Sequence, residues 1–152
     1  MPFLPEQRDK FKKVGEELDT GEIAKKIVRD NDNILIDMNA QDQLYAKGVN
    51  RLGVRIDEYQ PYRPLTIQVK IEKRQPYDRV TLKDTGEFYD SFYVETAEDR
   101  FYIKASDEKA NWLIKKYGAE IFGLTNDSLA EFINDYVKDE AYNRVKEILN
   151  ER

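Results

Sequence analysis

The chain has 152 residues, the length of one ordinary domain, so we expect a single domain over residues 1–152 with one core. Hydrophobic residues make up 40% and charged residues 36%, a polar composition that still suffices for folding. The formal net charge of −5 argues against a protein whose whole surface coats nucleic acid, because binding to phosphates requires an excess of Lys and Arg.

Two residue types that commonly carry chemistry are missing from the sequence. There is no cysteine, which excludes disulfides and thiolate chemistry, and no histidine, the commonest acid/base and metal ligand near neutral pH. We therefore expect no catalysis, cofactor or metal. No stretch approaches the roughly 18 apolar residues of a membrane span, and the charged start MPFLPEQRDKFKK is unlike a secretory signal, so we expect the protein to stay where it is made.

The first third of the sequence predicts helices. Residues 1–20 read as a short helix or arm, and residues 21–48 as a long helix whose apolar positions recur at helical spacing. Gly48 supplies the left-handed residue that ends this helix. The run Asp30-Asn31-Asp32-Asn33 lacks the later ligands of a calcium loop, so it predicts a kink or local break.

Residues 49–105 are predicted to form strands and loops. Pro61, Pro64 and Pro76 argue against a long helix here, while GVRIDEY and LTIQVKI alternate as strands do. Two aromatic runs, DTGEFYDSFYVET and RFYIKAS, predict a hairpin because their connection is short.

Residues 106–152 predict two helices. The first is capped by Ser106 and Asp107 and closed by Gly118, and the second is capped by Thr125 or Asn126. The order helices, strands, helices lacks the alternation of a parallel α/β fold. We therefore expect an α+β fold with a largely antiparallel sheet of three to four strands, packed by the N-terminal and C-terminal helices.

Asp84-Thr85-Gly86 matches the signature of aspartic proteases, and Ile121-Phe122-Gly123 imitates their second element. In a dimeric enzyme of that kind, two copies of Asp84 would share a proton. The alternative is a turn, in which Asp84 accepts from backbone N–H groups and Gly86 adopts a conformation that other residues avoid. We favour the turn, because Lys83 precedes Asp84 and no glycine-rich flap follows.

A basic segment covers residues 70–83 and includes one tyrosine. It can be interpreted as a nucleic-acid-binding module, or as an electrostatic patch that faces an acidic partner subunit; we favour the second. Ten tyrosines and seven phenylalanines are many for this length and suit subunit interfaces. The predicted interface residues are Lys70, Lys73, Arg74, Tyr77, Arg79, Phe88, Tyr89, Phe92 and Tyr93.

The segment LKDTGEFYDSFYVE is followed by a predicted strand, a helix ending in KYG, the residues IFGLT and a long terminal helix. Residues 41–150 thereby resemble the tail-component or virion-morphogenesis family of tailed phages. QLYAKGVNRLGVRIDEYQPYRPLTIQVK is also similar to proteins of phage and prophage structural clusters, including those of crAss-like phages. The matching motif residues are Thr85, Gly86, Phe88, Ser91, Tyr117, Gly118 and Gly123.

The resemblance implies a virion structural subunit that is made in the host cytoplasm. Such a subunit forms a homo-oligomeric ring at the head-tail junction (neck) or the tail end, and contacts adjacent ring, portal or tail proteins. Any contact with DNA would be made through the ring lumen and would not be sequence-specific. The family's usual arginine and small residues after Thr-Gly are replaced here by Glu87, Tyr89 and Asp90.

Overall fold

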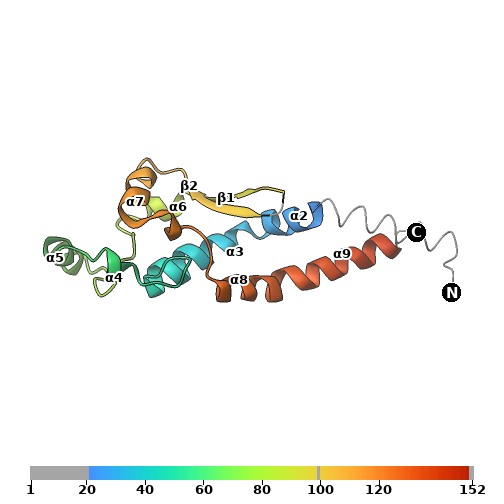
Figure 1. Cartoon of the computed structure of the whole chain (residues 1–152), viewed down its shortest axis with the longest axis horizontal. Helices are drawn as coiled ribbons and strands as arrows, with labels where there is room; N and C mark the ends of the chain where they lie inside the picture. Colours follow the sequence, from blue (N-terminus) through green and yellow to red (C-terminus); the bar gives the residue numbers. More distant parts are fainter. Residues whose placement is uncertain (1–20, 99, 151–152) are drawn as a thin grey trace.

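The computed structural model describes residues 21–98 and 100–150. The helix or arm predicted for residues 1–20 lies outside these residues. Figure 1 shows an elongated arrangement in which α5 lies at one end, and α2 and α9 pack against each other toward the other end. The β1–β2 hairpin lies along α2 and α3.

The predicted long helix consists of consecutive segments: α2 (Glu22–Asp30), α3 (Asp32–Asp37) and the π-helix η1 (Met38–Lys47). Its predicted break falls at Asn31, whose side-chain amide donates to the Ile27 carbonyl oxygen at 2.8 Å. The helix ends at Gly48, which has a φ of 63°. Both features predicted for this segment are therefore confirmed.

The predicted sheet of three to four strands is wrong. The described residues contain one two-stranded antiparallel sheet, in which β1 (Phe92–Thr96) pairs with β2 (Phe101–Ala105), and helices form most of the remaining regular structure. The predicted hairpin is confirmed by this pairing, which sets Val94 opposite Ile103. GVRIDEY contributes only an isolated bridge between Val49 and Arg55, followed by the short helix α4 (Ile56–Tyr59).

LTIQVKI forms the helix α5 (Pro64–Glu72) instead of a strand. Pro64 occupies the first turn, where its fixed φ suits a helix and its missing N–H has no helical partner. The segment Glu87–Asp90 is also helical (α6) and begins at Gly86, which has a φ of 95°. Burial of neighbouring aromatic residues explains why this segment is helical. A strand would direct Phe88 and Tyr89 to opposite faces, whereas both are buried together with Phe92.

The C-terminal third contains α7 (Ala110–Tyr117), the 3₁₀-turn η2 (Ala119–Ile121), α8 (Asn126–Phe132), the π-helix η3 (Ile133–Val137) and α9 (Lys138–Asn150). Thr125 caps α8 as predicted, because its hydroxyl accepts from the Ser128 N–H at 3.2 Å. The last helices pack on α2 instead of covering a broad sheet. The core centres on side chains that are fully buried: Leu35, Leu44, Ile56, Val80, Ile121 and Phe132.

Candidate functional site

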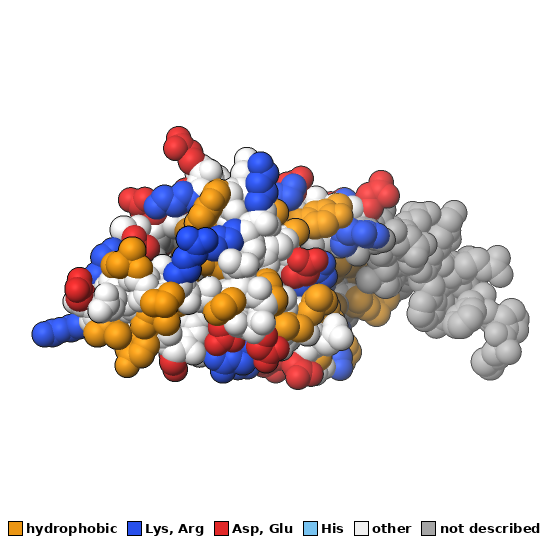
Figure 2. Space-filling view, turned by 60° about the vertical axis from the view of Figure 1, so that its left-hand side comes forward, with side chains coloured by type: hydrophobic (Ala, Val, Ile, Leu, Met, Phe, Trp, Pro, Cys, Tyr) orange, Lys and Arg blue, Asp and Glu red, His pale blue; other side chains and the backbone are white. Residues whose placement is uncertain are grey.

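Helix α5 turns apolar side chains toward solvent. Leu65 is 72% exposed, Ile71 50% and Val69 40%, while the one buried residue of this helix is Lys70. The strand-like alternation of LTIQVKI is the cause, because apolar residues at every second position spread around a helix and only one side of it can pack. Figure 2 brings this end of the molecule forward and shows hydrophobic side chains at the surface among charged ones.

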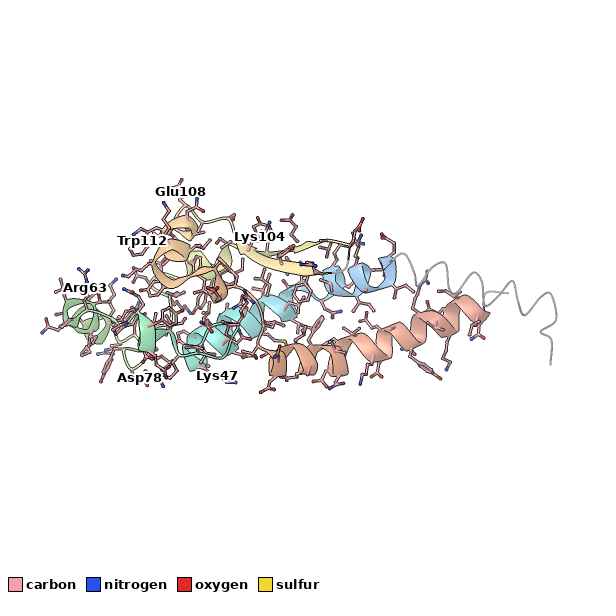
Figure 3. The ribbon with its side chains drawn as sticks, in the orientation of Figure 1. Lys47, Arg63, Asp78, Lys104, Glu108 and Trp112 are labelled. Carbon is pink, nitrogen blue, oxygen red and sulfur yellow. The ribbon has the colours of Figure 1, made fainter. Side chains whose placement is uncertain are left out.

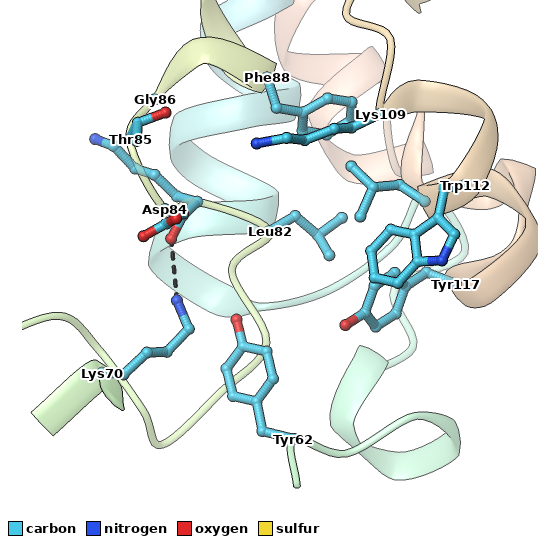
Figure 4. A pocket seen from close by; sticks show the side chains of 12 residues that line it. Tyr62, Lys70, Leu82, Asp84, Thr85, Gly86, Phe88, Lys109, Trp112 and Tyr117 are labelled. Carbon is cyan, nitrogen blue, oxygen red and sulfur yellow. Dashed lines mark hydrogen bonds between the residues drawn. The ribbon is translucent and has the colours of Figure 1, made fainter. Parts of the chain in front are cut away.

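Lys70 anchors α5 to the rest of the molecule. Its ammonium donates to the Lys83 carbonyl oxygen at 3.0 Å and to Gln75 Oε1 at 3.4 Å. The same nitrogen lies 5.1 Å from the centre of the Tyr62 ring, a distance at which a cation is attracted to an aromatic face. Figure 4 shows Lys70 reaching across to the segment that precedes Asp84. Polar contacts therefore fix the helix and leave its apolar side chains available.

Asp84 strengthens the same attachment. Its carboxylate accepts from Lys73 Nζ at 2.8 Å, and its backbone oxygen accepts from Gln75 Nε2 at 2.9 Å. The Lys73 hydrogen bond lowers the pKa of Asp84 below its usual value. A protease dyad requires the opposite, a carboxyl that holds a shared proton in a dry pocket, whereas the Asp84 side chain is 57% exposed. Gly86 adopts the left-handed conformation of the predicted turn, with a φ of 95°. The side chain that accepts from a backbone N–H there is Thr85, from Glu87 at 3.3 Å, whereas the Asp84 carboxylate accepts from the side chains of Lys73 and Gln75.

A cavity of about 310 Å³ lies beside this attachment. Trp112 and Tyr117 of α7, together with Tyr62, provide aromatic walls, as Figure 4 shows. Trp112 is 59% exposed, and the Lys116 ammonium lies 4.9 Å from its ring centre. Burial raises the pKa of Tyr117 to about 12. Charged side chains also line the cavity, among them Lys83, Asp84 and Lys109.

The remaining members of the basic segment have different surroundings. Arg79 Nε donates to the Tyr45 carbonyl oxygen at 2.6 Å, and its Nη1 contacts Asp78 Oδ1 at 2.6 Å. Arg74 is exposed at a φ of 57°, just after α5, and Tyr77 is 52% exposed. Because Lys70 is buried and Lys73 and Arg79 are paired, the segment does not present a continuous row of free cations.

The aromatic residues that were predicted as interface contacts divide into two groups. Phe88, Tyr89 and Phe92 are buried and pack against one another, with Phe88 and Phe92 edge to face at 5.0 Å between ring centres. The Tyr89 hydroxyl donates to the Thr81 carbonyl oxygen, and burial raises its pKa well above its usual value. These three residues are core residues; Tyr93, which is 43% exposed, remains available for contact.

The residues on which the predicted resemblance rests include several that lie at bends of the chain. Ser91 Oγ donates to the Phe88 carbonyl oxygen at 2.7 Å, at the point where α6 passes into β1. The Tyr117 carbonyl oxygen accepts from the Tyr59 hydroxyl at 2.8 Å, which ties α7 to α4. Gly118 and Gly123 have φ values of 89° and 112°, and both lie in the connection from α7 to α8. Their role in this structure is conformational.

Two buried amides that the sequence reasoning missed hold this connection in place. Asn39 donates to the Ile121 carbonyl oxygen at 3.0 Å and accepts from the Gly123 N–H at 2.9 Å. Gln43 donates to the Gly123 carbonyl oxygen and accepts from the Thr125 N–H, both at 2.9 Å. Their spacing of four residues, one helical turn, on an otherwise apolar face is the signal that could have revealed them.

Within residues 21–98 and 100–150, no three acidic side chains gather closely enough to hold a metal ion. In that same part of the chain, no helix has the length and apolar character needed to cross a membrane. No family model, curated protein or solved structure matches the chain.

Proposed function

We propose that this chain is a structural subunit of a bacteriophage virion, which forms a ring at the head-tail junction or the tail end. In this proposal it contacts copies of itself and adjacent ring, portal or tail proteins, and carries out no catalysis. The observation that carries the proposal is α5, whose Leu65, Val69 and Ile71 are exposed on a helix that is firmly attached. The resemblance of LKDTGEFYDSFYVE to the phage family supplies the setting.

The size of a stable interface supports including the cavity beside α5. Specific interfaces bury roughly 800 Å² per partner, more than one face of a nine-residue helix offers. The cavity, which the exposed ring of Trp112 helps to line, reaches α5 at Lys70, so a partner that extends past this end of α5 would cover it as well. Aromatic residues enclosed in pockets are typical anchors of protein interfaces. A neighbouring subunit that covers both features would complete a surface that one chain leaves open.

Native mass spectrometry across a wide range of protein concentration tests this proposal. We expect the parent chain to form a defined oligomer, and we expect the double variant Leu65→Glu/Val69→Glu to remain monomeric, because two charges would be buried in the interface. The thermal unfolding of the monomer should change little, since both side chains are exposed.

The matched control is Gln68→Glu, which adds a negative charge on an exposed position of the same helix without removing an apolar contact. It should assemble as the parent does, or nearly so. A parent chain that stays monomeric at every concentration, or a double variant that assembles as well as the parent, would contradict assembly through α5.

A further inference from the structure

The outer edge of β2 carries unpaired backbone groups. Pairing with β1 is bounded by hydrogen bonds from Ala97 N to Arg100 O and from Ser106 N to Ser91 O. In an antiparallel pair, successive residues direct their backbone groups alternately toward the partner strand and away from it. Tyr102 and Lys104 therefore direct their N–H and C=O groups toward β1, while Phe101, Ile103 and Ala105 direct theirs away. No backbone hydrogen bond from these outward groups to any other described residue is found. The edge is thus open to a further strand.

A groove of about 790 Å³ runs along this edge. Its opposite wall is the connection from Ala119 to Leu124. Asn39 and Gln43 hold that wall through their four hydrogen bonds to residues 121–125, so the groove keeps its width without a ligand. Preorganised binding sites lose less entropy when a partner is ordered in them.

The lining of the groove indicates the chemistry of its occupant. Apolar side chains of Ile103, Phe122 and Leu124 form part of it. Its charged members among the described residues are all basic, namely Arg51, Arg100 and Lys104, and the exposed Lys104 ammonium is ion-paired with Glu95 of β1 at 2.7 Å. An exposed ion pair of this kind contributes little to stability, so a carboxylate of a bound segment can replace Glu95. The whole chain carries a net charge of −5, so this basic groove contrasts with the rest of the protein. An acidic segment complements it, because opposite potentials attract across an interface.

We propose that the groove binds an extended acidic segment of another protein, which adds to β2 as a third strand. Backbone groups of the segment pair with Phe101, Ile103 and Ala105. Alternate side chains of a strand point to opposite faces, so apolar residues of the segment contact the groove floor while its carboxylates face the basic residues. The inference is independent of the proposed function, since the groove lies away from the α5 end, as the positions of Lys104 and Arg63 in Figure 3 show.

Binding is measured by fluorescence anisotropy with a short labelled peptide of alternating glutamate and valine. A peptide of alternating lysine and valine is the charge control. We expect the acidic peptide to bind and the basic one not to bind. Arg51→Glu should weaken binding by about tenfold, the effect of losing one charge-assisted contact. Lys115→Glu, an exposed lysine of α7, should leave binding unchanged.

Amide hydrogen exchange followed by NMR tests the strand addition itself. On peptide binding, the amides of Phe101, Ile103 and Ala105 should gain at least about tenfold protection, whereas Tyr102 and Lys104 are already protected. Equal binding of the two peptides, no binding, or unchanged outward amides would overturn the proposal. If protection of the outward amides rises with protein concentration in the absence of peptide, a second copy of the chain occupies the groove, which would also overturn the proposal.

These outcomes are separate from those of the assembly test. Loss of oligomers in the Leu65→Glu/Val69→Glu variant concerns α5 alone, and that variant should still bind the acidic peptide. Circular dichroism of Arg51→Glu verifies that the variant is folded before its affinity is interpreted.

Discussion

Asp84 illustrates how one ion pair changes the chemistry that a motif suggests. Asp-Thr-Gly alone is compatible with a protease, but the carboxylate is exposed and bound by Lys73 at 2.8 Å. The sequence could predict the turn at Gly86 from residue types. It could not predict Lys73 as the partner, because the two residues are brought together by the attachment of α5, a segment that the alternation of LTIQVKI predicted as a strand.

The pH dependence of Asp84→Asn measures this ion pair. The folded pKa of Asp84 is lowered, so its contribution to stability is present above the unfolded pKa of about 3.9 and is lost as the pH falls through the folded pKa. At pH 7 we expect the variant to lose less than about 1 kcal/mol, because the pair is exposed to solvent. Urea unfolding from pH 7 down to acid should show this difference disappear.

Asp90→Asn is the matched control, since Asp90 is exposed and no ion pair of it is found among the described residues. Its stability difference from the parent should stay near zero over the same pH range. A difference for Asp84→Asn that grows in acid would indicate a carboxyl that is protonated in the folded protein and would favour the dyad.

At the scale of elements, the predicted helix ends at Gly48, Gly118 and Thr125 are found, whereas the strand predicted for LTIQVKI is not. The ends of helices at Gly48, Gly118 and Thr125 follow from backbone conformation and capping, which neighbouring residues determine. The alternation in LTIQVKI failed, because a strand requires another strand beside it and Pro64 already favours a helix start.

Gly48 allows a close approach between two segments that the sequence does not place together. A Cβ at this position would lie 2.9 Å from the Arg79 Cβ and 3.2 Å from the Val80 carbonyl oxygen, at a φ of 63°. We expect Gly48→Ala to lose about 2–4 kcal/mol of unfolding free energy, from the left-handed backbone and from crowding together. Chemical denaturation measures this loss.

Gly53→Ala separates the two contributions. Gly53 has a φ of 77°, but nothing lies within 4 Å of an added Cβ, so only the backbone cost of about 1 kcal/mol is expected. Equal losses in the two variants would mean that the Arg79–Val80 segment moves aside freely, and that η1 is not held against it at Gly48.

The whole molecule distributes its buried residues unevenly. The π-helix η1 buries Met38, Asn39, Ala40, Gln43 and Leu44, whereas α5 buries only Lys70. The helical spacing of apolar positions in residues 21–48 predicted a long helix from sequence alone. The exposed apolar surface of α5 could not be predicted, because LTIQVKI contains enough apolar residues for a buried strand and only the fold determines which of them are covered.

This imbalance predicts how hydrogen exchange changes with assembly. In the monomer, amides of α5 should exchange at least about tenfold faster than those of η1, because α5 buries only Lys70 and its opening exposes little apolar surface, whereas the opening of η1 exposes five buried residues. Mass spectrometry of peptides covering residues 64–72 and 38–47 measures both. When oligomers form, exchange in α5 should slow and that in η1 should stay unchanged. The Leu65→Glu/Val69→Glu variant should keep the fast exchange at every concentration, whereas oligomers in which α5 still exchanges fast would place the contact elsewhere.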